Sequence, residues 1–289
     1  MPLQFNIPEA EFRRRAKRIK ALVFDLDDTL LNNEKNIPEP ALRSIRALQK
    51  AGVFVSICTA RNCSAAQYYA QQLDILGVYS AVSGCQLVDG QTGTLVSSHA
   101  MQNEDAIRLV EFCLEHNLPF SLSIGSDGYV GGPLEPDSDP IKRRLRQKKT
   151  VVPGYSMKKL TDPGILCGAS VYKIVVHTES AYPLLSGFIH KNISSAQCAI
   201  TSKGIINIFP AGYNKGAGII QIAEQMNISP AEFCTFGDFW SDVPMFEVSG
   251  LSVAMGNAKA DVRKKASAVT EAADQDGIAL VLNSVFLTG

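Results

Sequence analysis

The segment Ala21–Asn33, with the sequence ALVFDLDDTLLNN, joins an apolar run to three closely spaced carboxylates. Residues 21–24 are apolar throughout, which is typical of a buried strand in a parallel sheet. Asp25, Asp27 and Asp28 follow at once. Two carboxylates about 4 Å apart repel by roughly 4 kcal/mol at an effective dielectric near 20. Because a divalent cation relieves this repulsion, the crowding indicates a metal site at the end of the strand.

On both sides of a long middle section, strands alternate with helices. The predicted elements are strands at 21–24, 53–58, 78–84, 233–236 and 251–255, and helices after Pro40 and at 64–73, 215–226 and 277–286. This alternation predicts an α/β fold, with a Rossmann-like, doubly wound parallel sheet covered by helices on both faces. In such sheets ligands bind beyond the carboxyl ends of the strands, where Asp25 and Thr59 lie.

The middle section has a different rhythm, in which a strand, a helix and a hairpin occur twice. It is predicted to be an inserted α+β domain built from two β-α-β-β halves. The predicted parts are an N-terminal basic helical extension (1–20), a core (21–84 and 211–289) and the inserted domain (85–210). The basic residues of the extension and of KRRLRQKK, Lys142–Lys149, are interpreted as solvated surface, with anion binding or steering as the alternative.

The composition narrows the class of protein. The chain has 289 residues, of which 46% are hydrophobic, so it has enough apolar side chains for folded cores. Its 28 basic residues balance 28 acidic ones, which gives no bias toward nucleic acid or a membrane surface. No apolar run approaches the ~20 residues that span a bilayer. A polar N-terminus and seven scattered cysteines without C-x-x-C predict a cytoplasmic protein with reduced thiols, and the oligomeric state is left open.

Four distant segments carry polar side chains to the same predicted sheet edge: Asp25–Thr29, Thr59–Arg61, Asn214–Gly216 and Gly237–Asp242. Carboxylate ligands without nearby histidine or cysteine suit Mg²⁺. A phosphoryl group would add negative charge, which the Lys215 ammonium would balance. The Thr59 hydroxyl and the backbone N–H groups beyond Leu26 and Ala60 are expected to donate to phosphoryl oxygens. This combination predicts carboxylates that hold a metal and attack phosphorus.

The motifs FDLDDTLL, CTAR, YNKG, FGDFWSD and AMGNA occur in this order, and together they resemble those of the haloacid dehalogenase superfamily. The insertion between CTAR and YNKG resembles the α/β cap, of the C2 type, in the Cof-type subfamily of sugar-phosphate and cofactor phosphatases. The resemblance covers about residues 20–289 and leaves only the N-terminal extension outside. It implies a phosphatase core with a cap that selects the substrate.

The resemblance implies a role for each residue that matches a motif. Asp25 would be the nucleophile and a Mg²⁺ ligand, and Asp238 a further ligand. Asp27 would be the general acid and then the base, with its backbone carbonyl on the metal. Thr59 would bind a phosphoryl oxygen, Lys215 would balance charge, and Asp242 would orient Lys215 or a metal-bound water.

Several positions depart from the family pattern. Asp28 stands where the family usually has glycine, and it is assigned no role. Ser241 replaces the usual asparagine, which implies a weaker contact with phosphate or water. Ser83 likewise stands where asparagine is usual, at the entrance to the cap. Arg61 is interpreted as a structural residue or a substrate contact, and Asn214 as a phosphate contact or a helix cap.

The sequence therefore predicts a Mg²⁺-dependent phosphatase that acts on a small phosphorylated metabolite through an aspartyl-phosphate. Two alternatives remain open: a phosphomutase on the same fold, and a catalytically silent metabolite-binding module. Dehalogenase chemistry is disfavoured because it needs neither Asp27 as an acid nor a metal. The partner is expected to be a small phosphorylated substrate, without nucleic acid or membrane, and the residues do not identify that substrate.

Overall fold

Contacts divide the chain into two compact units. The computed structural model describes residues 3–125, 127–138, 157–202 and 204–287. The core unit comprises Met1–Ser97 and Asn214–Gly289, and the inserted unit comprises Ser98–Tyr213. The division begins the inserted unit at Ser98, whereas the sequence places its start at residue 85. The basic segment Lys142–Lys149 lies outside the described residues.

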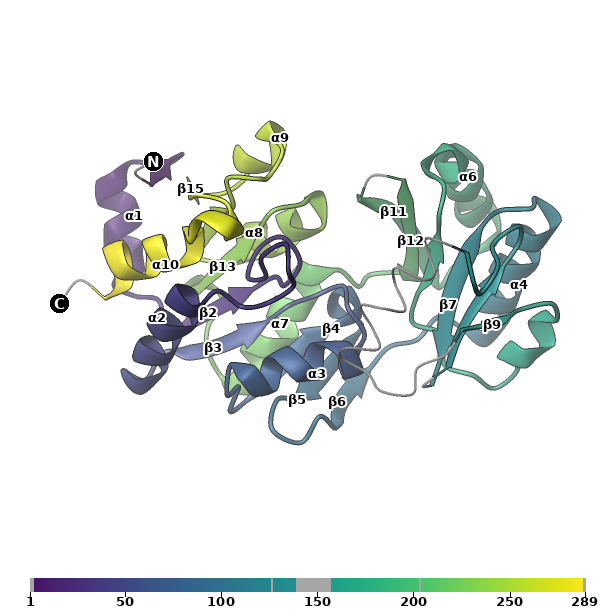
Figure 1. Cartoon of the computed structure of the whole chain (residues 1–289), viewed down its shortest axis with the longest axis horizontal. Coiled ribbons are helices and arrows are strands. Elements are labelled where there is room, and N and C mark those ends of the chain that lie inside the picture. Colours follow the sequence, from purple (N-terminus) through teal and green to yellow (C-terminus); the bar gives the residue numbers. More distant parts are fainter. Residues whose placement is uncertain (1–2, 126, 139–156, 203, 288–289) are drawn as a thin grey trace. The chain divides into compact units, whose positions relative to one another are not determined.

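A six-stranded sheet forms the centre of the core unit (Figure 1), in the order β1-β15-β14-β13-β2-β3. Its strands are β1 (Gln4–Phe5), β15 (Ala268–Val269), β14 (Leu251–Ala254), β13 (Phe233–Gly237), β2 (Ala21–Phe24) and β3 (Phe54–Ile57). All neighbouring pairs are parallel except β1 with β15. The predicted Rossmann-like parallel sheet is therefore confirmed.

The register of the two central strands decides which residues leave the sheet together. Phe24 of β2 lies opposite Phe236 of β13, and their rings stack with centroids 4.8 Å apart. Because the strands are parallel, Asp25 and Asp238 emerge at the same edge of the sheet. The backbone N–H of Asp25 donates to the carbonyl of Phe236 at 2.9 Å, which fixes this register at the strand end.

Helices cover the sheet and bury its apolar side chains. The helices of the core unit are α1 (Glu9–Ala16), α2 (Glu39–Lys50), α3 (Cys63–Gln72), α7 (Lys215–Met226), α8 (Val243–Val248), α9 (Ala260–Arg263) and α10 (Gly277–Val281). Ala21 and Val23 of β2 pack in one cluster with Ile219 of α7 and Phe246 of α8. Since neighbouring side chains of a strand point to opposite faces, Leu22 and Phe24 are buried on the other face.

A small antiparallel sheet, in the order β4-β5-β6, follows α3 in the chain. It consists of β4 (Val78–Ala81), β5 (Gln86–Asp89) and β6 (Leu95–Ser98). The predicted inserted domain (85–210) includes the segment of β6, but β6 pairs with β5, and the core unit extends to Ser97. The turn between them closes locally, because Asp89 Oδ1 accepts hydrogen bonds from Gln91 N and from Thr92 N and Oγ1.

The inserted unit is an α+β structure around a second six-stranded sheet, in the order β11-β12-β10-β7-β8-β9. Its elements are α4 (Asn103–Glu115), β7 (Phe120–Ile124), β8 (Asp127–Gly131), β9 (Met157–Lys159), β10 (Ile174–Val176), α6 (Tyr182–Asn192), β11 (Ala196–Ser202) and β12 (Ile205–Pro210). The second predicted β-α-β-β half corresponds to β10, α6, β11 and β12. Both helices contribute buried side chains to one cluster with the strands, so this unit has its own core.

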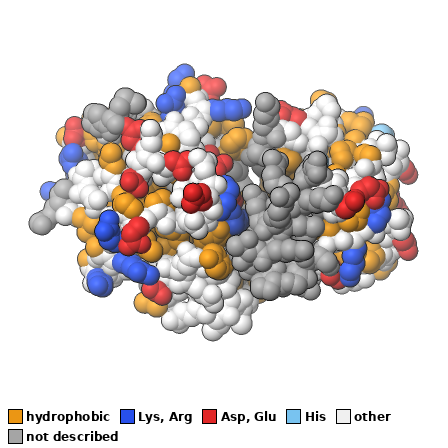
Figure 2. All heavy atoms as spheres, viewed as in Figure 1, with side chains coloured by type: hydrophobic (Ala, Val, Ile, Leu, Met, Phe, Trp, Pro, Cys, Tyr) orange, Lys and Arg blue, Asp and Glu red, His pale blue; other side chains and the backbone are white. Residues whose placement is uncertain are grey.

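Two surface properties agree with the composition. Figure 2 shows acidic and basic side chains interspersed over the described part of the face in view. No helix among the described residues has the length and apolar character needed to cross a bilayer.

The N-terminal extension is part of the core unit. β1 pairs with β15 at the edge of the sheet, with Gln4 opposite Val269. The Phe12 side chain is fully buried, and its ring lies edge-on to that of Phe5 at 5.2 Å. Arg13 pairs with Glu9 of the same helix at 2.8 Å. The extension therefore supplies an edge strand of the sheet, and part of its positive charge is paired with an acidic residue of the same helix.

Replacement of Phe12 by alanine tests whether the extension stabilises the core unit. Burial of the whole ring predicts a loss of about 3–5 kcal/mol in the free energy of unfolding. The only tryptophan of the chain, Trp240, lies in the core unit, so its fluorescence during urea unfolding measures the change. Arg14→Ala, at an exposed position of the same helix, is the control and should change this free energy by less than about 0.5 kcal/mol. Equal stability of F12A and R14A would contradict this role.

Candidate active site

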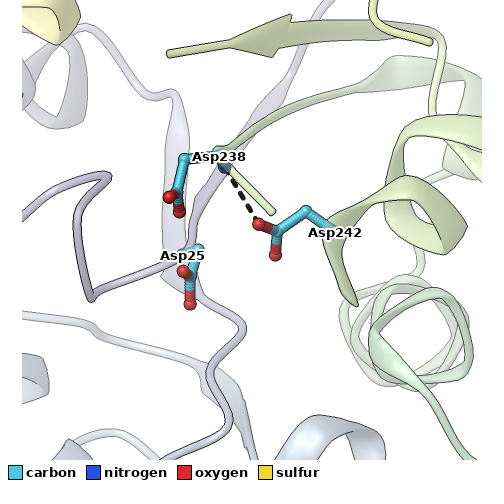
Figure 3. A group of neighbouring side chains, drawn as sticks. All are labelled: Asp25, Asp238 and Asp242. Atoms are coloured by element: carbon cyan, nitrogen blue, oxygen red, sulfur yellow. Dashed lines mark hydrogen bonds between the residues drawn. The ribbon is translucent and has the colours of Figure 1, made fainter. Parts of the chain in front are cut away.

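Three carboxylates meet at the carboxyl edge of the core sheet. Asp25 follows β2, Asp238 follows β13, and Asp242 ends the short 3₁₀ turn Trp240–Asp242. One oxygen from each lies within 4.8 Å of the others, and Figure 3 shows the Asp25 and Asp238 carboxylates close together with that of Asp242 beside them. The parallel register that aligns β2 with β13 explains how residues more than 200 positions apart come together. We call these three residues the acidic group.

A buried lysine joins the acidic group. Lys215 is the first residue of α7, whose N-cap is Asn214, with the Asn214 side chain accepting a hydrogen bond from Ala217 N at 3.0 Å. This contact gives Asn214 the capping role that was one of its two interpretations. Lys215 Nζ lies 2.7 Å from Asp25 Oδ1 and 2.5 Å from Asp242 Oδ1. The helix start therefore fixes the ammonium between two carboxylates.

Asp242 supports the site more than it offers ligand atoms. Its Oδ1 faces Lys215, while its Oδ2 accepts hydrogen bonds from the backbone N–H groups of Asp238 and Phe239, both at 2.9 Å. A Cβ atom on Gly237 would lie only 2.4 Å from Cβ of Asp242, so glycine permits this close approach. Both oxygens of Asp242 are thus engaged in holding Lys215 and the loop that carries Asp238.

Burial and mutual repulsion raise the pKa values of Asp25 and Asp238. Burial, together with Asp242 and Asp238, raises the pKa of Asp25 well above its ordinary value, although Lys215 opposes the rise. Burial and the Asp242 carboxylate raise the pKa of Asp238 to about 7. Burial disfavours the charged form of Lys215, but Asp242 and Asp25 outweigh this effect and raise its pKa. The three carboxylates of the site therefore carry more negative charge than the single ammonium of Lys215 neutralises.

These residues fit a divalent cation. Within the described part of the chain, Asp25 Oδ2 has no hydrogen-bond partner, and Asp238 accepts only from the polar side chains of Thr29 and Asn257. Oxygen donors of this kind suit Mg²⁺. A cation between Asp25 and Asp238 would also relieve the repulsion that raises their pKa values. The donor set and its charge thus agree with the predicted metal ligands Asp25 and Asp238.

The remaining predicted contacts lie on the loops that surround the acidic group. Thr59 follows β3 and is buried, and its hydroxyl accepts a hydrogen bond from Arg61 N at 3.1 Å. Leu26 has a buried side chain, and its carbonyl accepts from Leu31 N. Ala60 lies in the turn after β3, and Ser241 lies between Trp240 and Asp242. Contact of these four residues with phosphate stays a prediction.

Asp27 lies apart from the acidic group, since its carboxylate forms an ion pair with other residues. It accepts hydrogen bonds from Arg61 Nε at 2.8 Å and Arg61 Nη2 at 2.7 Å, and Lys35 Nζ lies 3.1 Å away. Burial opposes ionisation of Asp27, but Arg61 and Lys35 outweigh it and lower its pKa to about 2. Sequence reasoning missed this pair, because it depends on the conformations of two loops.

Two further residues were missed by the sequence analysis. Thr29 Oγ1 donates to Asp238 Oδ1 at 3.1 Å, and Asn257 Nδ2 donates to the carbonyl of Asp28 at 2.8 Å. Thr29 belongs to the segment FDLDDTLL and Asn257 to AMGNA, so the motifs contained the signal. Asp28 has φ = 59°, a left-handed conformation that glycine adopts without strain, which explains the glycine expected at this position.

Comparison with known proteins places this site in a family. The sequence model of the haloacid dehalogenase-like hydrolases matches residues 22–282. One relative, a 5-amino-6-(5-phospho-D-ribitylamino)uracil phosphatase, YwtE of Bacillus subtilis, is 27% identical over 287 residues, covering 92% of this chain and 98% of its own. Another, the stress response protein YhaX of the same species, is 25% identical and covers 92% of each chain.

Solved structures share the fold. A haloacid dehalogenase-like hydrolase from Bacteroides thetaiotaomicron superposes with a TM-score of 0.77 at 20% identity, covering 93% of this chain and 100% of that one. A structure described as the HAD subclass IIB sugar phosphatase BT4131 also gives 0.77, at 22% identity, covering 92% and 98%. The family match spans the inserted unit, the acidic group and the core strands other than β1. The chain therefore belongs to the haloacid dehalogenase-like hydrolase family.

Proposed function

We propose that this protein is a Mg²⁺-dependent phosphatase that hydrolyses a small phosphorylated metabolite through a phosphoryl group carried on Asp25. The observation that carries the proposal is the buried contact of Asp25 with Lys215, beside Asp238. A carboxylate held against a fixed cation suits attack on phosphorus, because the transferred group brings further negative charge. Relatives named as phosphatases support the same reaction.

In the first step, an oxygen of Asp25 forms a bond to phosphorus while the bond from phosphorus to the leaving-group oxygen breaks. Asp27 donates a proton to that oxygen, so the product leaves as an alcohol. The anionic phosphoryl group raises the pKa of a nearby carboxyl, which counters the lowering caused by Arg61. Lys215 balances charge, and Thr59, the N–H groups beyond Leu26 and Ala60, and Ser241 contact the phosphoryl oxygens.

In the second step, Asp27 takes a proton from a water molecule as that water attacks phosphorus. The bond between phosphorus and Asp25 then breaks, inorganic phosphate leaves, and the Asp25 carboxylate is restored. Mg²⁺ bound to Asp25, Asp238 and the Asp27 carbonyl would supply additional neutralisation of phosphoryl charge. Asp242 has a supporting role, since it holds Lys215 and the Asp238 backbone.

The substrate is proposed to be a sugar phosphate or a phosphorylated cofactor. The relative YwtE acts, by its name, on a phosphorylated ribitylaminouracil, and the structural neighbour BT4131 is described as a sugar phosphatase. The inserted unit is proposed to be the cap that selects the leaving group. In the core unit, Trp240 lies between Asp238 and Asp242 in the sequence, and its exposed side chain is proposed to contact a ring of the substrate.

Phosphate release from a panel of phosphate esters tests this function. With Mg²⁺, sugar phosphates, nucleotides, pyridoxal phosphate, flavin mononucleotide and p-nitrophenyl phosphate are each incubated with the protein. We expect phosphate from at least one metabolite, and loss of more than about 10²-fold of that rate in EDTA, because metal neutralisation contributes several kcal/mol. Restoration by Mg²⁺ but not by Ca²⁺, which prefers more ligands at longer distances, is the control.

Other outcomes identify the alternatives. An isomerised hexose phosphate without free phosphate would indicate a phosphomutase. Absence of any product, combined with a ligand that raises the melting temperature, would indicate a metabolite-binding module. Phosphate release that is indifferent to EDTA would reject the metal requirement.

A further inference from the structure

The carboxylate of Asp27 is held by a set of side chains that the predicted mechanism leaves without a role. Arg61 comes from the loop after β3, Lys35 from the loop between β2 and α2, and Tyr69 from α3. We call Asp27, Arg61, Lys35 and Tyr69 the Asp27 cluster. All its members belong to the core unit.

Arg61 binds both oxygens of Asp27 with the Nε–Nη2 edge of its guanidinium. Nε donates to Oδ2 at 2.8 Å and Nη2 donates to Oδ1 at 2.7 Å, while Lys35 Nζ lies 3.1 Å from Oδ1. Such a pair fixes the plane of the carboxylate, which a single hydrogen bond does not. A carboxylate offers roughly four acceptor positions, two on each oxygen. The contacts with Arg61 and Lys35 occupy both positions on Oδ1 and one of the two positions on Oδ2. The remaining position on Oδ2 is where Asp27 can exchange a proton.

Arg61 is itself held in place. Its Nη1 donates to the Tyr69 hydroxyl at 3.3 Å, and its guanidinium carbon lies 4.9 Å from the centroid of the Tyr69 ring. The Tyr69 hydroxyl in turn donates to the Lys35 carbonyl at 3.0 Å, and the Tyr69 side chain is buried. The backbone N–H of Arg61 donates to Thr59 Oγ1. One residue therefore links the Asp27 carboxylate to the hydroxyl proposed to bind phosphate.

We propose that Arg61 is a positioning residue, which orients Asp27 so that Oδ2 exchanges the proton of the leaving group. The inference rests on the proposed function, because it assigns a partner to the acid of that reaction. If Arg61 had only a structural role, its replacement should have a small effect on the protein. The Asp27 side chain is 42% exposed, and exposed ion pairs contribute little to stability. If Arg61 positions Asp27, its replacement should lower kcat/KM, and the loss should be larger for a leaving group that needs a proton.

Two phosphate esters separate these roles. p-Nitrophenolate is a stable anion that leaves without a proton, whereas glycerol leaves from glycerol phosphate only as the protonated alcohol. The measured quantity is kcat/KM, which reports the steps up to departure of the leaving group. Since general acid catalysis contributes about 10²–10⁴-fold, Arg61→Gln should lower kcat/KM for glycerol phosphate about 10²-fold more than for p-nitrophenyl phosphate. Asp27→Asn should show the same selectivity.

Matched variants isolate the fork. Arg61→Lys keeps the charge but cannot make the bidentate contact. Its kcat/KM for glycerol phosphate, relative to that for p-nitrophenyl phosphate, should therefore fall almost as much as in R61Q. Tyr69→Phe, which removes the hydroxyl that contacts Arg61 Nη1 and the Lys35 carbonyl, should show a smaller loss with the same selectivity. Arg46→Gln, at an exposed position of α2, should leave both values unchanged. Thermal melting of each variant shows whether it is folded.

The outcomes are distinct. Equal losses of kcat/KM for both esters in folded R61Q, or full recovery in R61K, would overturn the positioning role. A faster reaction of glycerol phosphate in R61Q would also overturn it, by showing that the pair restrains Asp27. If the wild-type protein releases phosphate from neither ester nor from the metabolite panel, the proposed function itself fails, and no variant is needed to see that.

Discussion

Phosphate release is expected to fall by about 10⁴-fold or more when Asp25 is replaced by asparagine. Asparagine has nearly the same shape, but its amide oxygen is a poor nucleophile and cannot form the acyl phosphate. The effect should appear with every substrate, including p-nitrophenyl phosphate, because the attacking atom is common to all of them. Measurement of kcat for the purified variant with saturating Mg²⁺ provides the test.

The same variant should lose activity without losing stability. Removal of one carboxylate from the acidic group relieves the repulsion that raises the pKa values of Asp25 and Asp238. In metal-free buffer, D25N should therefore melt no lower than the wild-type protein. Asp261→Asn, at an exposed position of α9, is the matched control and should keep full activity. Substantial turnover by folded D25N would reject Asp25 as the nucleophile.

Replacement of Lys215 by methionine has the next largest expected effect, and it changes activity and stability together. Lys215 is only 2% exposed and pairs with Asp25 and Asp242, so its removal leaves buried carboxylates without their partner. The expected loss in the free energy of unfolding is about 3–5 kcal/mol at pH 8. Loss of the charge that balances the phosphoryl group should also lower kcat by about 10²–10³-fold, as for other electrostatic contacts of this kind.

The stability deficit of K215M should depend on pH. The pKa of Asp238 is about 7 in the folded protein against an ordinary value near 3.8, so the folded state binds more protons between these values. The contribution of Asp238 to the free energy of unfolding is therefore present at low pH and is lost as pH rises through about 7. Lys215 lowers the pKa values of Asp25 and Asp238, so without it these two carboxyls should hold their protons more strongly, and the deficit should be smaller at pH 5.5 than at pH 8.

Urea unfolding at the two pH values measures this difference. Lys259→Met, at an exposed position, is the control and should show no pH-dependent deficit. Added Mg²⁺ should recover part of the stability at pH 8, because it neutralises the same carboxylates. A deficit that is equal at pH 5.5 and pH 8 would mean that the charges of the acidic group are not its source.

The main features of the site were predictable from local sequence rules. Residues 21–24 form an uninterrupted apolar strand, and Asn214 followed by an apolar-rich segment predicts a helix start at Lys215. Both boundaries agree with β2 and α7. Because parallel strands present their carboxyl ends at one edge, the meeting of Asp25 with Asp238 followed from the strand pattern alone.

Features that depend on loop conformation were not predictable in this way. The Asp27–Arg61 pair joins two charged residues in turns, where no periodicity restricts the backbone. The segment of β6 was assigned to the inserted domain because its short sequence does not indicate which sheet it joins, whereas in the structure a short hairpin pairs it with β5. The contact of β1 with β15 likewise joins two-residue strands, which are too short to carry a pattern.

The pairing of β1 with β15 has a consequence for biosynthesis. Residues Gln4 and Phe5 are translated more than 260 residues before their partners Val269 and Ala268. In the nascent chain, this edge segment must therefore wait for its partner strand until residues 268–269 have been made. The inserted unit is continuous in sequence and can fold as soon as it has been translated, whereas the sheet around Asp25 is completed only after residues 268–269 have been made.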